Sequence, residues 1–342
     1  MSGPHPAVAQ TRVSVRRWLA EHPPNGPVVV ACSGGADSLA LTAAAVHELP
    51  EVHAVVVDHQ LQEVSAQTAA TAAEQARGLG CAQVRVLNVD VVGAGGLEAA
   101  ARRARYRALR SVGAPVLLGH TLDDQAETVL LGLGRGSGSR SLAGMRAWDP
   151  PWGRPLLAVR RSLTQEACLA LGLQPHHDPH NDDPGFTRVR LRHEVLPLLE
   201  EVLGGGVVDA LGRTATQLRE DCEALDEWAA QVSAGARRGA ELEVAELEHA
   251  PAAVRRRVLR HWLTAHGATA LTDRQLRWVD ELVAAWRGQG GVSVGGRLVV
   301  LRRHGRLAVE SGPVESSPVQ SPRGPQDGDH QGQTTVRSPR GV

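Results

Sequence analysis

A glycine-rich segment lies between an apolar run and a helix-length, alanine-rich run. A glycine turn where a strand meets a helix directs backbone N–H groups toward one point, and the helix dipole adds positive partial charge there. Such a turn can bind phosphate without a cationic side chain. Asp37 would repel a bare anion, so its carboxylate predicts a Mg²⁺ ion between itself and the phosphates. The expected nucleotide contacts are Ser33, Gly34, Gly35, Ala36, Asp37 and Ser38.

We expect Ser33 to cap the helix, and the plainer alternative for this segment is a capped helix after a buried strand with no ligand. The chain contains no lysine, so all 37 of its cationic side chains are arginines. This composition excludes a Schiff-base lysine, a catalytic lysine amine and a Walker-type phosphate loop. The formal net charge is zero, so any binding of nucleic acid must depend on local patches of charge.

A second cluster of ionisable side chains begins at His120 and ends at Glu127. In a helix that starts near Thr121, Asp123 and Glu127 are related as i and i+4, and Asp124 and Glu127 as i and i+3. The carboxylates therefore point broadly to one side, where their charge suits a cationic substrate. One of them, or His120, could act as a base. The alternative is a helix start that is acidic only because of the helix dipole.

Short apolar runs alternate with helix-length segments through the first half of the chain. Apolar strands separated by helices indicate a parallel sheet covered on both faces, which is the α/β class. Ligands bind such sheets at the carboxyl ends of the strands. The glycine segment, Asp58–His59 and His120–Asp124 all follow predicted strands. The predicted strands are 27–32, 53–58, 84–89 and 115–120, and the predicted helices are 36–48, 65–79 and 97–112.

The pattern changes after about residue 205, which predicts a domain boundary there. We expect a nucleotide-binding catalytic domain over 1–205, followed by a smaller, mainly helical domain over 206–310. Residues 311–342 are rich in Pro, Gly, Ser and Gln, and we expect a disordered tail. The second domain is predicted to contain helices at 206–232, 251–266 and 273–287 and a small hairpin or meander at 290–310.

Two features bear on where the protein works. No stretch approaches the roughly 20 apolar residues that span a bilayer, and the N-terminus has no uninterrupted apolar core. The cysteines are far apart and form no CxxC pair, which argues for thiols in a reducing compartment. We therefore expect a cytoplasmic protein with no membrane partner. The cysteines are Cys32, Cys81, Cys168 and Cys222.

The glycine segment resembles the SGGxDS signature of the PP-loop ATP pyrophosphatases, which split ATP into AMP and pyrophosphate while they adenylate a substrate oxygen. Within that superfamily, "LGHTLDDQAETVLL" (118–131) resembles the HxxDDxxET signature of the tRNA(Ile)-lysidine synthase family. "EAAARRARYRAL" (98–109) is similar to the ARxxRY segment of that family. Later blocks at 135–145, 154–157 and 178–199 are also similar, and a weaker likeness extends beyond residue 250.

The resemblance implies a Rossmann-like, adenine nucleotide alpha-hydrolase-like sheet and a defined reaction. Free L-lysine would be joined to carbon 2 of the wobble cytidine of the CAU-anticodon isoleucine tRNA. ATP, with Mg²⁺ on Asp37, would first adenylate the cytidine, and Arg102 would contribute to the nucleotide site. Asp124 and Glu127 would contact lysine, and a homodimer is a further expectation. The implied catalytic residues are Asp37, Arg105, His120, Asp124 and Glu127.

Arginines in "TRVRLRH" (187–193) suggest a contact with the tRNA. On a helix, Arg188 and Arg192 are i and i+4, whereas Arg190 lies away from that face. We predict that Arg188 and Arg192 bind tRNA phosphates. The alternative is an ordinary solvated helix face.

The chain departs from the family pattern at several positions. Gln60 and Gln62 replace a glycine and an arginine, His180 replaces a serine, and Val189 replaces an asparagine. Larger members carry an additional C-terminal domain, and we expect these 342 residues not to include one. One alternative function is a PP-loop cytidine thiolase, which would need paired cysteines. Another is a non-catalytic adenine-nucleotide or RNA-binding module, which would not need three carboxylates near a polyphosphate.

Overall fold

The contacts of the chain, in a computed structural model, form two compact units, Met1–Leu225 and Asp226–Val342. The division falls inside helix α10, Val207–Ala236, whereas the sequence predicts it ahead of that helix, at residue 205. The structure describes residues 3–60, 65–92, 96–136, 138–178 and 182–312.

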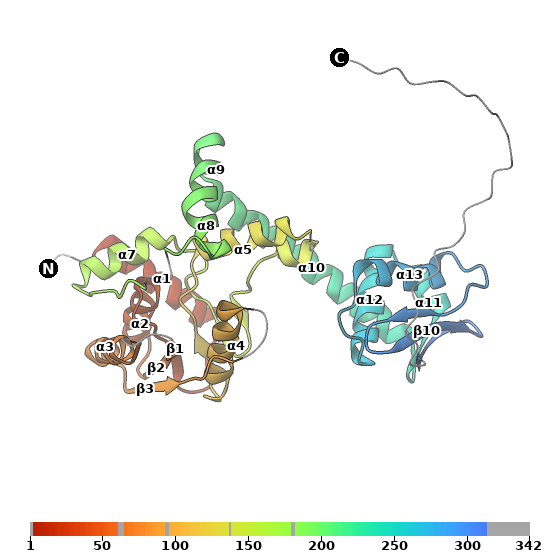
Figure 1. Ribbon diagram of the computed structural model, residues 1–342, viewed down its shortest axis with the longest axis horizontal. Helices are drawn as coiled ribbons and strands as arrows, with labels where there is room; N and C mark the ends of the chain where they lie inside the picture. Colours follow the sequence, from red (N-terminus) through yellow and green to blue (C-terminus); the bar gives the residue numbers. More distant parts are fainter. Residues whose placement is uncertain (1–2, 61–64, 93–95, 137, 179–181, 313–342) are drawn as a thin grey trace, which may run out of the picture. The chain divides into compact units, whose positions relative to one another are not determined.

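The first unit contains a mostly parallel sheet with the strand order β3-β2-β1-β4-β6-β5. Strands β1, β2 and β3 of this sheet are labelled in Figure 1. Strand β1 pairs in parallel with both β2 and β4, so the strand order reverses at its edge. Ligands bind open α/β sheets outside the carboxyl ends of strands at such a reversal. These pairings confirm the predicted α/β class. The strands are β1 Val28–Ala31, β2 Val52–Asp58, β3 Gln83–Asn88, β4 Val116–Leu117, β5 Trp148–Asp149 and β6 Trp152–Gly153.

Alternate residues of β1 fill the two halves of the core. Val28 and Val30 are buried among residues of α1, α2, α3 and α7, whereas Val29 packs with Leu109 of α4 on the other face. A strand that is apolar on both sides is buried on both faces, as expected for a parallel sheet. The covering helices are α1 Pro6–Glu21, α2 Ala36–Glu48, α3 Ser65–Gly78, α4 Leu97–Arg110 and α7 Arg161–Ala170.

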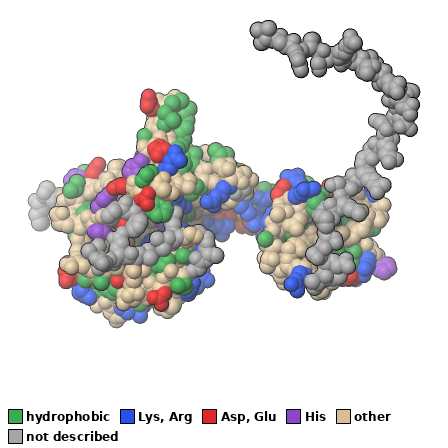
Figure 2. All heavy atoms as spheres, viewed as in Figure 1, with side chains coloured by type: hydrophobic (Ala, Val, Ile, Leu, Met, Phe, Trp, Pro, Cys, Tyr) green, Lys and Arg blue, Asp and Glu red, His purple; other side chains and the backbone are tan. Residues whose placement is uncertain are grey.

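The remaining helices of the first unit pack beyond the end of β4. Buried Ala126 of α5 packs against Leu196 of α9 and Val208 of α10. The outer side of α9 stays apolar, with Leu198 57% and Val202 69% exposed (Figure 2). These helices are α5 Leu122–Gly134, α6 Ser139–Leu142, α8 Thr187–Arg190 and α9 Leu196–Val202, with a π-helical turn at Leu191–Val195.

The second unit combines helices with an antiparallel sheet of order β7-β8-β11-β10-β9. The predicted hairpin is thus part of a larger sheet, because β8 also pairs with β11. Arg255 of α12 and Asp280 of α13 form a buried ion pair, with Nη2 to Oδ2 at 3.2 Å. The elements are β7 Arg237–Arg238, β8 Glu241–Glu243, α11 Val244–Glu248, α12 Ala252–Ala265, α13 Asp273–Ala284, β9 Val292–Val294, β10 Leu298–Arg303 and β11 Arg306–Ser311.

Two expectations concern the chain as a whole. None of the helices within the described ranges combines the length and the apolar character needed to cross a membrane. The predicted disordered tail begins at Ser311, which is the last residue of β11, and residues 313–342 lie outside the described part of the chain.

Candidate functional site

The glycine turn after β1 has a backbone suited to an anion. Helix α2 begins at Ala36 with Gly35 as its N-cap, and no side chain caps it, so the predicted Ser33 cap is wrong. Gly34 has φ +80°, a conformation that glycine adopts without strain. The Ser38 hydroxyl accepts a hydrogen bond from the Ser33 N–H at 3.1 Å and donates to the Gly35 carbonyl at 2.9 Å. The turn is therefore fixed by its own hydrogen bonds, and the helix start has no side-chain cap.

Gly34 is the position in this turn where a side chain would cost most. A Cβ added there would lie 3.0 Å from the Ala72 Cβ and would also be held at a positive φ. We expect Gly34→Ala to lower the free energy of unfolding by about 1–3 kcal/mol, measured by chemical denaturation.

Two other glycines provide matched controls. Gly172 has φ +67° but open space around it, so Gly172→Ala isolates the conformational penalty. Gly35 has φ −75° and a nearest neighbour at 3.6 Å, so Gly35→Ala should cost less than Gly34→Ala, through the weaker N-cap alone. Equal losses in Gly34→Ala and Gly35→Ala would contradict the prediction.

The second predicted motif lies directly against this turn. A Cβ added to Gly119, which follows β4, would lie 3.0 Å from the backbone of both Asp37 and Ser38. Only glycine permits so close an approach without a shift of the chain. Parallel pairing of β1 and β4 therefore brings together two segments that are about eighty residues apart.

The acidic segment forms the start of helix α5, as predicted. Thr121 is the N-cap, and its backbone N–H and hydroxyl donate to Asp124 Oδ2 at 2.8 and 2.9 Å. Thr121 and Asp124 thus form a capping box, which fixes the Asp124 carboxylate. Glu127, one turn later, is fully buried. We call Asp37, Asp124 and Glu127 together the carboxylate cluster.

Arg161, the first residue of α7, joins the three members of the carboxylate cluster. Its Nε lies 3.3 Å from Asp37 Oδ2, its Nη2 2.6 Å from Asp124 Oδ1, and its Nη1 3.4 Å from Glu127 Oε1. The other oxygen of Asp37 accepts a short hydrogen bond from the Thr164 hydroxyl. One guanidinium therefore contacts both the glycine turn and the acidic helix start. The glycine turn and the acidic helix start therefore lie side by side, as predicted.

Two further arginines reach the same cluster from the segment after residue 186. Arg192 Nε lies 2.8 Å from Glu127 Oε1, and Arg188 Nη1 lies 3.5 Å from Glu127 Oε2. Arg190 points elsewhere and pairs with Glu194, as its spacing predicts. The expected tRNA contacts, Arg188 and Arg192, thus lie against the buried carboxylate of Glu127. Their side chains are about one third exposed, and their contact with tRNA stays a prediction.

The environment shifts the pKa values of Asp37 and Asp124 in opposite directions. Burial raises the pKa of Asp37 above its ordinary value, and Arg161 only partly offsets this. Burial also acts to raise the pKa of Asp124, but Arg161, His120 and the Thr121 hydrogen bonds outweigh it, so that this pKa is lowered. Asp124 is therefore ionised in the folded protein, whereas an additional positive charge would stabilise the ionised form of Asp37.

His120 is a neutral imidazole beside Asp124. Burial lowers the pKa of His120 to about 3, with Arg105 contributing and Asp124 opposing. No group in the described part of the chain makes a hydrogen bond to its buried Nδ1. A neutral imidazole can accept a hydrogen bond from a substrate, but so low a pKa makes it a weak base, so the role of His120 as a base stays a prediction.

A buried neutral histidine has a consequence for stability. Between the unfolded pKa of about 6.5 and the folded pKa of about 3, the unfolded chain binds the proton more tightly, so stability falls as pH falls. We expect the stability advantage of the native protein over His120→Asn to shrink below about pH 6.5, by at most about 1.4 kcal/mol per pH unit. Urea denaturation of both proteins at several pH values tests this. A difference that stays constant with pH would contradict it.

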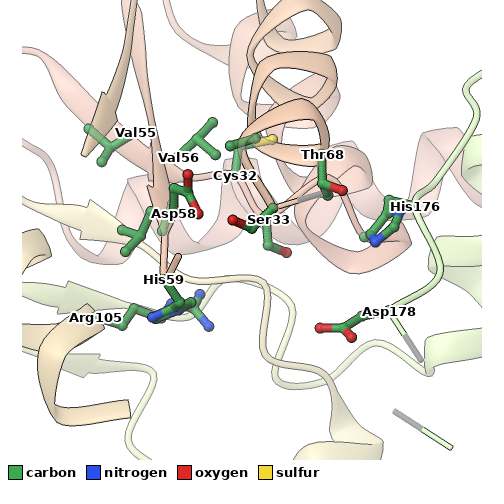
Figure 3. A pocket seen from close by; sticks show the side chains of 15 residues that line it. Cys32, Ser33, Val55, Val56, Asp58, His59, Thr68, Arg105, His176 and Asp178 are labelled. Carbon is green, nitrogen blue, oxygen red and sulfur yellow. The ribbon is translucent and has the colours of Figure 1, made fainter. Parts of the chain in front are cut away.

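A cavity of about 330 Å³ opens beside the glycine turn. It lies between the carboxyl ends of β1 and β2 and helix α3, with Ser33 at its centre (Figure 3). His59 and Arg105 lie on one side, and His176 and Asp178 on the other (Figure 3). The backbone N–H of His176 donates to the Gly34 carbonyl at 2.9 Å, which attaches this segment to the turn. The cavity has apolar walls from both strands and a polar rim, as small-molecule sites do.

The two predicted arginines of α4 have different environments. Arg105 lines the cavity, and burial lowers its pKa. Arg102 lies over the ring of Tyr106, 4.9 Å from its centroid, and Nη2 is 3.3 Å from the Tyr106 hydroxyl. Arg105 is thus in place to contact a ligand, whereas Arg102 is not among the residues that line the cavity. Its nucleotide contact stays a prediction.

Some departures from the family pattern can be located. Gln60, in place of a glycine, adopts φ +52°, and its N–H donates to Asp58 Oδ1 at 2.9 Å. A side chain thus occupies a backbone conformation that glycine favours. Val189 is buried. Gln62 and His180 lie outside the described residues.

The predicted Mg²⁺ can be compared with the donors present. No group of three or more His, Cys, Asp or Glu residues in the described ranges is arranged to hold a metal ion by itself. Magnesium usually binds through one or two carboxylates together with substrate phosphates. The Asp37 carboxylate in the first turn of α2, directly after the glycine turn and with a raised pKa, fits that mode.

Comparisons with known proteins agree with this geometry. Residues 9–199 match the PP-loop domain, and residues 242–308 match the TilS substrate binding domain. The tRNA(Ile)-lysidine synthase of Rhodococcus erythropolis is 62% identical over 309 residues, which cover 88% of this chain and 95% of that protein. The tRNA(Ile)-lysidine synthase of Mycobacterium tuberculosis is 59% identical, with coverage of 90% and 98%. The chain belongs to the tRNA(Ile)-lysidine synthase family.

A solved structure shares the fold of this lysidine synthase family member. The U34-tRNA thiolase NcsA from Methanococcus maripaludis, solved with its 4Fe-4S cluster, matches with a TM-score of 0.53 at 18% identity. The match covers 63% of this chain and 80% of the thiolase chain. The thiolase alternative is not favoured for this chain, because all four cysteines are buried and burial raises the pKa of Cys81 and Cys168 to about 11.

Sequence reasoning missed several residues of this lysidine synthase site. The most important are Arg161 and Thr164, which contact Asp37 from α7. A signal was present, because Arg160 and Arg161 stand at a helix start, where the dipole disfavours cations unless carboxylates compensate. His59, His176 and Asp178, which line the cavity, were also not among the predicted site residues.

Proposed function

We propose that this chain is a tRNA(Ile)-lysidine synthase, which ligates free lysine to the wobble cytidine of the CAU-anticodon isoleucine tRNA. Its family uses ATP, and the reaction has two steps. The cytosine carbonyl oxygen forms a bond to the α-phosphorus of ATP, and the bond to pyrophosphate breaks. The lysine ε-amine then bonds to carbon 2 of the ring, AMP leaves, and the amine loses a proton.

The first step is assigned to the cavity and the glycine turn. The cavity beside β1 and β2 would hold the nucleoside of ATP, and the uncapped start of α2 would hold the departing pyrophosphate through backbone N–H groups. Asp37 would hold Mg²⁺, which neutralises charge on the triphosphate when bound. Arg105, which lines the cavity, would add positive charge.

The second step is assigned to the start of α5. Asp124 and Glu127 would bind the lysine ammonium, which has an ordinary pKa of about 10.4 and must lose a proton before it attacks. The neutral imidazole of His120, beside Asp124, can accept a hydrogen bond from that amine, whereas its lowered pKa makes it a weak base. The carboxylates thus select a cationic amine.

One observation carries this proposal. The Arg161 guanidinium contacts Asp37 on the glycine turn together with Asp124 and Glu127 on the acidic helix start. A polyphosphate on the first and an amine on the second would therefore meet in one site. A nucleotide-binding module without catalysis has no need of that arrangement, so this alternative is not favoured.

The test is mass spectrometry of CAU-anticodon isoleucine tRNA after incubation with ATP and isotopically labelled lysine. We expect the label on the wobble cytidine, and pyrophosphate release that depends on the tRNA. A tRNA with uridine at the wobble position should remain unlabelled. Pyrophosphate release without any labelled tRNA, or sulfur in place of lysine, would contradict the proposal. Cytoplasmic localisation and a homodimer stay predictions.

A further inference from the structure

The carboxylate cluster is already neutralised by arginines of this chain. Three carboxylates, Asp37, Asp124 and Glu127, face three guanidinium groups within 4 Å. The formal charge of this set is therefore zero. A free ammonium ion brought to such a set would have to compete with guanidinium groups that already neutralise the carboxylates. The arginines are Arg161, Arg188 and Arg192.

Arg161 differs from the other two arginines in what it touches. Arg188 and Arg192 have contacts with the α5 carboxylates, whereas Arg161 also contacts Asp37 of the glycine turn at 3.3 Å. Its shortest contact, 2.6 Å, is with Asp124 Oδ1, an oxygen that an incoming lysine ammonium would need. Arg161 thus covers the expected lysine site and reaches to the expected phosphate site.

The backbone of Arg161 is fixed, although its guanidinium has two possible partners. The Arg161 N–H donates to Asp123 Oδ2 at 2.7 Å, and the residue begins helix α7. A change of partner therefore requires only side-chain rotation. Arginine forms strong bidentate hydrogen bonds with phosphate as well as with carboxylate. A triphosphate bound at the turn, next to Asp37, lies on the side toward which the Arg161 Nε already points.

We propose that Arg161 covers the lysine-binding carboxylates in the absence of nucleotide and moves to the triphosphate when ATP binds. This inference rests on the proposed function. ATP then creates the lysine site, because departure of the guanidinium frees Asp124 Oδ1 and one of the contacts of Glu127 Oε1 for an incoming ammonium. Lysine binds after ATP, and the amine does not occupy the site before there is a nucleotide to activate the cytidine.

Direct measurement of lysine binding tests the inference without turnover. Equilibrium dialysis of labelled L-lysine is carried out with and without magnesium α,β-methylene-ATP, in which the bond that the reaction breaks cannot be cleaved. We expect the nucleotide analogue to tighten lysine binding to the native protein at least tenfold, about 1.4 kcal/mol of coupling. Equal lysine affinity with and without the analogue would overturn the proposal.

Substitution of Arg161 identifies the residue responsible. Arg161→Met should bind lysine without nucleotide as tightly as the loaded native protein does, so that the coupling disappears. Arg161→Lys keeps the positive charge but loses the planar guanidinium group, so it should retain part of the coupling. It serves as the second variant if Arg161→Met does not fold. Coupling that persists unchanged in both variants would overturn the proposal. Weaker lysine binding in both conditions would assign the guanidinium to the lysine carboxylate and would also overturn it.

Arg160 provides the matched control. It is the neighbouring arginine, and it pairs with Asp209 at 3.1 Å and with Asp123 at 3.5 Å, not with the carboxylate cluster. Arg160→Met should leave the coupling intact. Labelling of tRNA by each preparation is measured in parallel. Lysidine formation without coupling would reject only the role of Arg161, whereas absence of lysidine from the native protein would reject the proposed function.

Discussion

Asp37→Asn is expected to lower tRNA-dependent pyrophosphate release roughly 1000-fold, because it removes the carboxylate in the first turn of α2, directly after the phosphate-binding turn. The substitution keeps the shape of the side chain and can still accept the Thr164 hydrogen bond. It removes the charge that would hold Mg²⁺ against the triphosphate. Lysidine formation should fall by the same factor, because the second step needs the adenylated cytidine. Pyrophosphate release and labelled tRNA are measured on the same samples.

The loss should not be caused by unfolding. Burial raises the pKa of Asp37, which means that the folded protein disfavours the charged form of this carboxyl group. Removal of the charge should therefore leave the midpoint of thermal unfolding unchanged or slightly higher. Asp149→Asn is the matched control, since Asp149 is exposed on β5, outside the site. Pyrophosphate release within tenfold of the native rate in Asp37→Asn would exclude the proposed role.

The sheet and the meeting of the two motifs could be predicted because each depends on local patterns. Apolar runs located β1, β2, β3 and β4, and the rule that parallel strands end at one edge placed Asp37 near Glu127. Strands β5 and β6 have two residues each, which is too short for any periodicity. The break between the compact units lies within the continuous helix α10, where no Gly or Pro cluster marks it.

The arginines of the site show where prediction from sequence ends. Arg188 and Arg192 were recognised by their spacing, but spacing does not reveal that their partner is Glu127, more than sixty residues earlier. Arg161 belongs to a helix whose packing against α2 decides what it touches. Partners chosen by tertiary packing are not encoded in a local pattern. The same holds for His59 and Asp178, which are far apart in the sequence and line one cavity only in the folded chain.

Glu127→Gln is expected to separate the two steps of the reaction. Glu127 is fully buried and contacts Arg161, Arg188 and Arg192, so the substitution removes the negative charge at the centre of the expected lysine site. Lysidine formation should fall about 1000-fold, whereas tRNA-dependent pyrophosphate release should fall less than about tenfold. Adenylated tRNA should therefore accumulate, and mass spectrometry detects it directly. The KM for lysine should rise as well.

A stability loss must be separated from this catalytic effect. Removal of one partner from a buried ion pair leaves uncompensated charge and costs about 3–5 kcal/mol in other proteins. Glu127→Gln should thus lower the midpoint of thermal unfolding, and the rates must be compared well below it. Glu194→Gln is the matched control, because Glu194 makes an exposed pair with Arg190 and should change neither step. Glu127 is the fully buried carboxylate of the cluster, and three guanidinium groups contact it. A folded Glu127→Gln protein with the native KM for lysine and the native turnover would therefore show that lysine is recognised elsewhere.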